Sequence, residues 1–196
     1  MQMAHECGMD VPECKLEKFS QYGSTFLVKR FDRRGKKRIH FSSAMTLPGK
    51  TDGADSQDGC SYLELAEFIM RYGAESERDL CELWRRIVFS IAVSNTDDHL
   101  RNHGFLLTKS GWKLSPAYDI NPDPRGYGLS LNISESDNAL DFSLALQVAP
   151  AFRLSACEAE SILKKTTGVV SRWKTYANAV GIPHSERETM WMAFRY

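Results

Sequence analysis

The feature that most constrains the fold is a long amphipathic segment near the middle of the chain. Its apolar residues recur at helical spacing in a broad stripe, which indicates a helix buried on that face: Leu80, Leu83, Trp84, Ile87, Val88, Ile91 and Ala92. Ser76-Glu77-Arg78-Asp79 precedes the stripe and predicts a capping box at the start of the helix. Such a helix requires other apolar elements around it, and it leads directly into the polar residues from Asn95 onward.

A predicted β-hairpin follows these polar residues. Two short apolar runs, 105–108 and 112–114, flank the turn Lys109-Ser110-Gly111. A hairpin returns the chain close to its starting point, so the segments on either side of it lie near each other. We therefore expect Asp119, which follows the second strand, to lie near the loop that begins at Asn95.

The remaining pattern predicts an α+β protein in which helices predominate. A short helix over residues 2–9 stops near Gly8, and residues 24–31 are rich in strand formers. Residues 32–37 form a charged turn, for which a solvated surface is the simplest interpretation. A further extended segment covers 38–41, a polar loop covers 48–60, and a helix ends at Gly73. Residues 140–195 are mostly helical, with breaks near Pro150, Gly168 and Gly181.

Composition narrows the class of protein. A chain of 196 residues forms one domain or two small lobes. Its formal net charge is zero, which gives no global case for binding nucleic acid or a membrane. The five cysteines include no Cys-x-x-Cys pair, which argues against a disulfide framework and fits the reducing cytoplasm. No apolar run approaches the ~18 residues of a transmembrane helix.

The polar residues after the central helix suit phosphoryl transfer. A kinase active site has a characteristic order of parts, and this sequence follows it: Asp97, four residues, Asn102, a hairpin and then Asp119. There the first Asp accepts the proton of the attacking hydroxyl, and the Asn and the later Asp hold Mg²⁺ through oxygen atoms. The Asp-x₄-Asn spacing also arises by chance, with Asp97 or Asp98 as a helix-end or turn residue. The helix before it and the hairpin after it are what favour the kinase interpretation.

A hydrolase metal site is a weaker alternative. His99 and His103 are four residues apart and lie beside Asp97, as in His/Asp metal sites. Because Asn102-His103-Gly104 is expected to lie outside any helix, the shared helical face would be lost. A structural role for His99, hydrogen-bonded to the loop backbone, is therefore the preferred interpretation.

Two stretches resemble the signature of HipA-like serine/threonine kinases, the toxin components of bacterial toxin–antitoxin pairs. They are Asn95-Thr96-Asp97-Asp98-His99-Leu100-Arg101-Asn102 and Leu114-Ser115-Pro116-Ala117-Tyr118-Asp119-Ile120. Upstream, residues 28–33 and Arg38-Ile39-His40 are similar to the segment that joins the two lobes in that family, and the helical tail extends the resemblance.

The resemblance implies a protein-kinase-like fold with a mostly helical C-lobe and a cytoplasmic enzyme that uses ATP and Mg²⁺. By motif, Asp97 would be the catalytic base, and Asn102 and Asp119 the magnesium ligands. The backbone of Lys29 and Phe31 would contact adenine as the hinge, although Lys29 departs from the acidic residue common there. The implied domains are an N-lobe remnant with hinge (1–47), a flexible loop (48–60) and a C-lobe with the catalytic hairpin (61–196).

Parts of a complete kinase are not recognisable in this sequence. No glycine-rich phosphate loop precedes residue 24, and no strand lysine is paired with a helix glutamate. We therefore expect weak phosphorylation or none by the chain alone, and robust autonomous activity would contradict this.

The family implies a protein substrate, in some members related to translation, and a DNA-binding antitoxin or a separate N-lobe as partner. No membrane or direct nucleic-acid contact is expected. The alternative is a non-catalytic binding module for such a partner. A lipid kinase is also conceivable, but no membrane-binding segment supports it.

Overall fold

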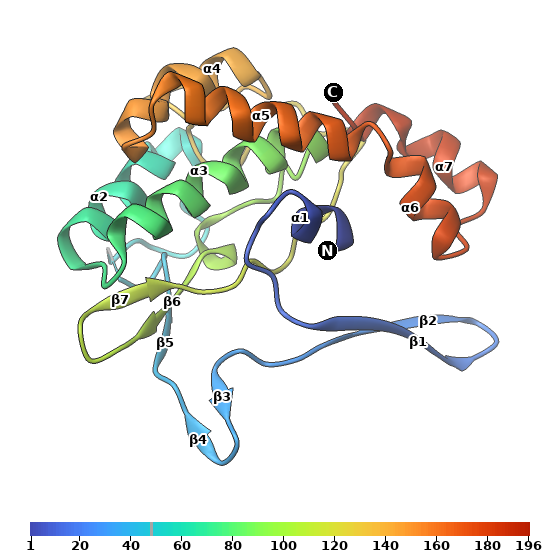
Figure 1. The fold of residues 1–196 in the computed structure, drawn as a ribbon, viewed down its shortest axis with the longest axis horizontal. Helices are drawn as coiled ribbons and strands as arrows, with labels where there is room; N and C mark the ends of the chain where they lie inside the picture. The colour runs from blue at the N-terminus through green and yellow to red at the C-terminus, as the bar shows by residue number, and fades with distance from the viewer. Residues whose placement is uncertain (48) are drawn as a thin grey trace.

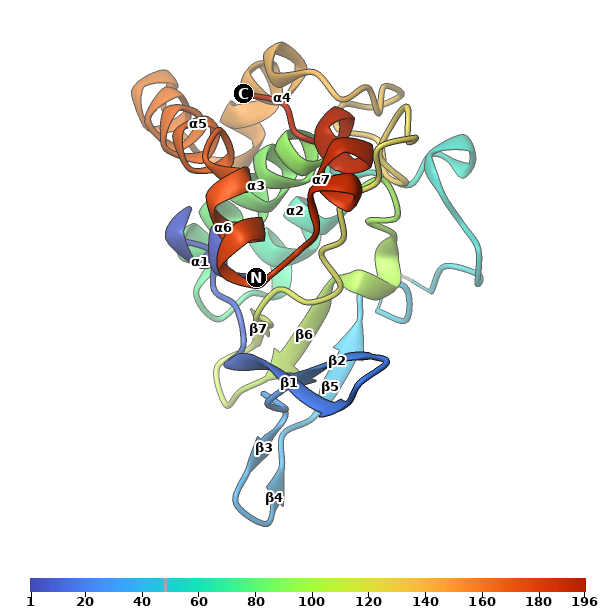
Figure 2. The ribbon, with the colours of Figure 1, turned by 90° about the vertical axis from the view of Figure 1, so that its right-hand side faces the viewer.

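The computed structural model describes residues 1–47 and 49–196. Pro48, the first residue of the predicted polar loop, lies outside the described residues. The helices gather on one side of the molecule and the strands on the other, an arrangement that two perpendicular views share (Figures 1 and 2). The α-helices are α1 (Gln2–Glu6), α2 (Tyr62–Tyr72), α3 (Ser76–Val93), α4 (Phe142–Val148), α5 (Ala156–Val170), α6 (Trp173–Ala179) and α7 (His184–Met190).

The predicted central helix is confirmed as α3, and the main core forms around it. Leu80, Leu83, Trp84, Ile87 and Ile91 are all fully buried. The Trp84 indole also donates a hydrogen bond to the Ala145 carbonyl at 3.0 Å, which ties α4 to α3. Burial of this wide apolar stripe is the main source of the helix's stability.

The predicted capping box of α3 is wrong. The helix begins after Glu75 without a side-chain cap, and the Ser76 hydroxyl donates to the Ile69 carbonyl at 3.0 Å instead. Asp79 is buried and accepts from the Leu114 amide. Ser76 and Asp79, which the local pattern predicted to cap the helix, therefore form hydrogen bonds with residues outside the helix instead. Complete capping boxes begin α2, from Ser61, and α5, from Ser155.

The predicted hairpin is confirmed as two strands of a three-stranded antiparallel sheet. β6 (Gly104–Leu107) pairs with β7 (Trp112–Leu114), and β5 (Phe41–Ser43) adds to the free edge of β6. Leu106 lies opposite both Phe41 and Lys113. An early segment of the chain thus joins the sheet that follows the loop of residues 95–102.

Two small ribbons come between α1 and β5 along the chain. β1 (Cys14–Ser20) pairs with β2 (Gly23–Val28), so the strand predicted over 24–31 ends earlier, at Val28, and its partner β1 was not predicted. The charged turn over 32–37 is a small hairpin, in which β3 (Arg33–Arg34) pairs with β4 (Lys37–Arg38). The charged residues of this segment show no strand pattern in the sequence, and the hairpin forms only because its two short strands pair across the turn.

Short 3₁₀ turns connect the larger elements: η1 (Ser56–Asp58), η2 (Leu100–Asn102), η3 (Ala149–Phe152) and η4 (Trp191–Ala193). The helix break predicted at Gly168 is wrong, because α5 continues to Val170 and α6 begins only at Trp173. Val169 and Val170 are buried in a second core with Ala4, Phe89 and Ala92, and this packing outweighs the small helix-breaking tendency of one glycine. Among the described residues, no helix is long and apolar enough to cross a membrane.

Candidate active site

The end of α3 aims the loop that carries Asp97. Ser94 adopts a left-handed conformation, with φ of 50°, and the Asn95 amide donates back to the Ser90 carbonyl at 2.8 Å. The helix therefore stops abruptly where the polar residues begin. The Asp97 side chain is 84% exposed, so it is accessible from solvent.

Asp98, the next residue, points into the protein instead. Its carboxylate accepts hydrogen bonds from the Tyr62 hydroxyl at 2.7 Å and from the Ser90 hydroxyl at 3.2 Å. It also lies 3.1 Å from His103 Nε2. Burial alone would raise the pKa of Asp98, but the charge of His103 and these hydrogen bonds hold that pKa below its usual range. Asp98 thus anchors the loop to α2, α3 and the start of β6.

Asn102 is held against the same loop. It ends the 3₁₀ turn η2, and its Nδ2 donates to the Asp97 carbonyl at 2.8 Å. This bond orients the amide so that Oδ1 is the atom left to bind a cation, and within the described part of the chain Oδ1 receives no hydrogen bond. A neutral amide oxygen of this kind suits Mg²⁺.

Asp119 lies on the segment that leaves the hairpin. Its φ of 55° is left-handed, a conformation that Asp tolerates better than most residues and that often marks a functional position. Asn121 Nδ2 donates to the Asp119 carboxylate at 2.7 Å, and the side chain is otherwise exposed. The carboxylate is therefore oriented but accessible.

Two hydrogen bonds tie this segment to the catalytic loop, one on each side of Asp119. The Tyr118 hydroxyl donates to the Arg101 carbonyl at 2.6 Å, and the Asn121 amide donates to the Asn95 side chain at 3.1 Å. Burial raises the pKa of Tyr118 to about 12, so the hydroxyl keeps its proton and remains a donor. These two hydrogen bonds join the hairpin exit and the loop into one unit, and the roles of Asp97, Asn102 and Asp119 within it stay a prediction.

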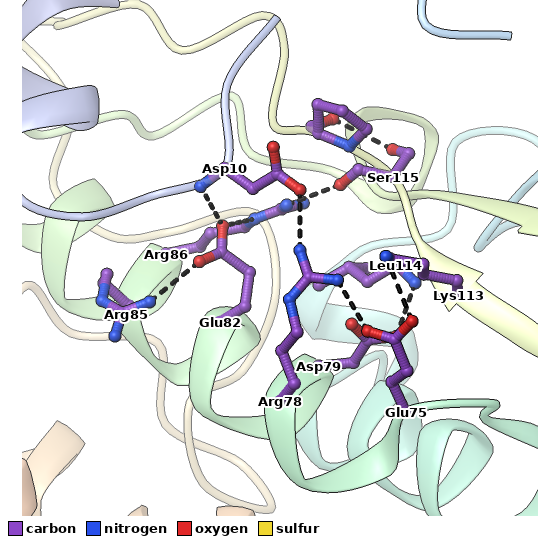
Figure 3. Close-up of polar contacts among 11 residues, drawn as sticks. Asp10, Glu75, Arg78, Asp79, Glu82, Arg85, Arg86, Lys113, Leu114 and Ser115 are labelled. Carbon is purple, nitrogen blue, oxygen red and sulfur yellow. Dashed lines mark hydrogen bonds and ion pairs between the residues drawn. The ribbon is translucent and has the colours of Figure 1, made fainter.

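A buried polar network attaches the hairpin exit to α3 (Figure 3). Asp79 accepts from the Leu114 amide at 2.7 Å, and Arg86 Nη2 donates to the Ser115 carbonyl at 2.6 Å. Glu82 accepts from Arg86 Nε and from the Asp10 amide, both at 3.1 Å. The network therefore sets the position of the strand end from which Tyr118 and Asp119 follow.

The predicted hinge lines a cavity beside this unit. The cavity holds about 450 Å³ and is bordered by Val28, Lys29, Arg30, Phe31, Asp32, Phe41, Arg101 and Tyr118. The Phe31 and Tyr118 rings stack, with centroids 5.8 Å apart. The Lys29 amide already donates to the Glu13 carbonyl, so Lys29 has only its carbonyl to offer a ligand. The backbone of Phe31 has no backbone partner within residues 1–47 and 49–196, so it is the better hinge contact of the two.

The ligands of the alternative hydrolase site do not converge. His103 is buried beside Asp98, whereas His99 Nε2 lies 3.9 Å from the exposed carboxylate of Asp97. In the part of the chain that the structure describes, no three His, Cys, Asp or Glu side chains are grouped so as to hold a metal ion. The arrangement favours the structural interpretation of both histidines.

Sequence reasoning missed the residues that support the site from behind. Tyr62 and Ser90 gave no signal, because each becomes a partner of Asp98 only through tertiary contact. Glu82 and Arg86 gave only a weak signal, because opposite charges four residues apart on a helix can pair, but both residues lie outside the apolar stripe that predicted the buried face.

Comparison with known proteins places the chain in a family. The HipA-like C-terminal domain model matches residues 1–173. A Haemophilus influenzae protein is 32% identical over 145 residues, and the match covers 67% of this chain and 42% of that protein. The serine/threonine-protein kinase toxin HipA of Shewanella oneidensis is 26% identical over 141 residues, and the match covers 61% of this chain and 32% of the toxin. The chain thus spans less than half the length of these relatives.

Solved structures agree on the fold. HipA of Shewanella oneidensis, solved in a complex with HipB and operator DNA, matches 98% of this chain and 51% of its own with a TM-score of 0.76 at 19% identity. The proinflammatory kinase CtkA of Helicobacter pylori matches 87% of this chain and 80% of its own, with a TM-score of 0.54 at 13% identity. The predicted α+β, protein-kinase-like fold is therefore confirmed.

Proposed function

Because the chain belongs to the HipA-like C-terminal domain family, we propose that it is the catalytic lobe of a serine/threonine protein kinase. In this proposal it transfers the γ-phosphate of ATP to a protein hydroxyl. The observation that carries the proposal is the double attachment of the hairpin exit to the catalytic loop, from Tyr118 to Arg101 and from Asn121 to Asn95. This attachment keeps Asp119 next to the loop that bears Asp97 and Asn102.

The residues have distinct roles in the proposed reaction. Asp97 accepts the proton of the acceptor hydroxyl, which its exposure allows. Asn102 Oδ1 and the Asp119 carboxylate are the metal ligands, and a set of oxygen donors fits Mg²⁺. Bound Mg²⁺ would neutralise the phosphate charge. Adenine would occupy the hinge cavity, where the Phe31–Tyr118 stack offers an aromatic surface.

We propose that the supporting parts of a full kinase come from outside the matched region. The chain corresponds to 51% of the HipA chain, so the cover over the phosphates and the ATP lysine are proposed to lie in the other half. Residues 1–47 would supply the hinge side, 48–60 the loop, and 61–196 the C-lobe. We propose a cytoplasmic protein that pairs with an N-lobe and a DNA-binding antitoxin and acts on a translation-related protein. A non-catalytic binding module for the same partners is the second candidate, and the nucleotide titration below distinguishes it from the kinase.

A test separates nucleotide binding from transfer. Purified chain is titrated with ATP by calorimetry, with and without Mg²⁺, and phosphotransfer is followed after adding the separately expressed N-terminal half of the Haemophilus influenzae relative. Asp119→Asn is expected to remove the Mg²⁺-dependent part of binding. Asp97→Asn is expected to retain binding but lose phosphotransfer by about 10²-fold or more.

Asp141→Asn is the matched control, because Asp141 caps α4 and Asn caps a helix equally well. Full phosphotransfer by Asp97→Asn would contradict the proposed base. Absence of Mg²⁺-ATP binding, alone and in the mixture, would support the binding module instead.

A further inference from the structure

Positive charge is concentrated in one short segment of a chain whose net charge is zero. Residues 29–38 contain one acidic residue, Asp32, and seven basic ones, namely Lys29, Arg30, Arg33, Arg34, Lys36, Lys37 and Arg38. Lys29 pairs with Glu13, and Arg30 and Arg33 both pair with Asp32. Within residues 1–47 and 49–196, the other four have no carboxylate in ion-pair distance. The unpaired cations all belong to the β3–β4 hairpin.

This hairpin extends away from the helices in both views (Figures 1 and 2). It borders a hollow of about 840 Å³, here called the basic hollow, whose other side is the β6–β7 turn. Arg34, Lys37 and Arg38 line it from the hairpin, Lys109 lines it from the turn, and Lys113 lines it from β7. Two separate hairpins thus direct cations at one space.

The acidic residues at the margin of the basic hollow are already engaged. Asp10 and Glu75 both pair with Arg78, at 3.0 and 2.8 Å, and Glu75 also pairs with Lys113 at 3.2 Å. They neutralise Lys113 but leave Arg38 and Lys109 without a counter-charge among the described residues. The hollow therefore keeps a net positive potential that favours an anionic occupant.

The walls between the cations are apolar. Phe31, Ile39, Leu106, Leu107, Leu114 and Pro116 line the same space. Leu107 is 44% exposed. A nucleic-acid backbone would use the cations and leave the apolar walls wet, whereas an acidic peptide with apolar side chains would use both. The volume also falls within the roughly 300–1,000 Å³ of typical binding sites.

We propose that the basic hollow is a docking site for a segment of a partner protein in which acidic residues alternate with large apolar ones. In an extended segment, successive side chains point to opposite sides. The apolar side chains can therefore contact the apolar walls while the acidic side chains contact the cations on the rim. The Phe31 ring lines both the basic hollow and the hinge cavity, which puts a docked segment beside the candidate nucleotide pocket. This inference goes beyond the proposed phosphotransfer and does not require it.

Fluorescence anisotropy with a labelled peptide in which glutamate alternates with leucine and phenylalanine tests the proposal. The double variant Arg38→Glu/Lys109→Glu is expected to weaken binding by about tenfold or more, because it replaces attraction with repulsion. Lys18→Glu/Lys164→Glu is the matched control, since both of these lysines are exposed elsewhere and the change in net charge is identical. It is expected to change affinity by less than about twofold.

A second pair of variants separates a peptide from a nucleic acid. Leu107→Ser is expected to weaken peptide binding by about threefold or more, whereas a change at Val180, an exposed apolar residue at the end of α6 that does not line the basic hollow, to Ser (Val180→Ser) leaves it unchanged. The absence of saturable binding, or equal losses for the two charge variants, would overturn the proposal. So would a single-stranded oligonucleotide that binds more tightly than the peptide and is insensitive to Leu107→Ser, because the surface would then bind nucleic acid. Circular dichroism of each variant confirms that it remains folded.

Discussion

At the scale of single residues, two adjacent aspartates of identical chemistry have opposite environments. Asp97 is exposed to solvent, and Asp98 is buried between Tyr62, Ser90 and His103. A buried carboxylate that loses its partners or its charge costs far more than an exposed one. Asp98 is therefore expected to serve stability and loop position, and Asp97 to serve the proposed chemistry.

Asp98→Asn is expected to lower the free energy of unfolding by about 3 kcal/mol, because it leaves His103 without its charged partner. Urea unfolding at pH 7 measures this, and Asp97→Asn, the neighbouring exposed site, is expected to stay within about 0.5 kcal/mol of the parent. The pKa of Asp98 is depressed in the folded state, so its contribution is present above the unfolded value of about 3.9 and is lost as pH falls through the folded value. The parent should lose stability on acidification more steeply than Asp98→Asn, and parallel pH profiles would contradict this assignment.

At the scale of elements, α3 acts as the platform for the whole site. Its end aims the catalytic loop, and its buried polar side chains hold the exit of the β6–β7 hairpin through Leu114 and Ser115. Burial raises the pKa of Asp79, opposed in part by the hydrogen bond from the Leu114 amide. The buried charged residues of α3 position the hairpin exit, whereas its apolar stripe forms the core, so the helix sequence meets both requirements.

Arg86→Met is expected to destabilise the protein by about 3 kcal/mol, because it leaves the Ser115 carbonyl unsatisfied and breaks the buried pair with Glu82. Arg85→Met is the matched control, since Arg85 is paired with the same Glu82 but is partly exposed, and its loss should cost at most about 1 kcal/mol. Thermal unfolding followed by circular dichroism compares the two. Equal losses of stability in the two variants would show that the contact of Arg86 with Ser115 does not stabilise the protein.

At the scale of the whole molecule, a packed helical body carries a ribbon that has no layer over it. No residue of β1 or β2 is buried. Leu16 and Phe26 lie opposite each other, as do Cys14 and Val28, so one face of the ribbon is apolar yet exposed. An isolated two-stranded hairpin is marginally stable in water, so the ribbon depends almost entirely on its own hydrogen bonds.

Hydrogen exchange measured by mass spectrometry is expected to show this contrast. Amides of residues 14–28 should exchange about 100-fold or more sooner than those of the buried part of α3, because local opening of the ribbon exposes little additional apolar surface. The β6–β7 hairpin is the internal comparison, since Phe105 and Leu114 are buried beneath it, and it should exchange at an intermediate rate. Protection of the ribbon equal to that of α3 would contradict this account.

Local patterns in the sequence were sufficient for several elements. The stripe from Leu80 to Ala92 predicted α3, and the runs around Lys109-Ser110-Gly111 predicted the hairpin, because helical and strand periodicities are properties of neighbouring residues. The order of Asp97, Asn102 and Asp119 along these elements also led to the family that the comparison shows. The roles of these three residues remain a proposal.

Contacts between distant residues settled the rest. The sequence does not tell which of the neighbours Asp97 and Asp98 is buried, and only packing against Tyr62 and Ser90 decides it. The strand β1, the continuation of α5 through Gly168 and the hinge cavity likewise depend on partners far along the chain. Periodicity reports which face of an element is buried, but burial energy and hydrogen bonding in three dimensions select the partner.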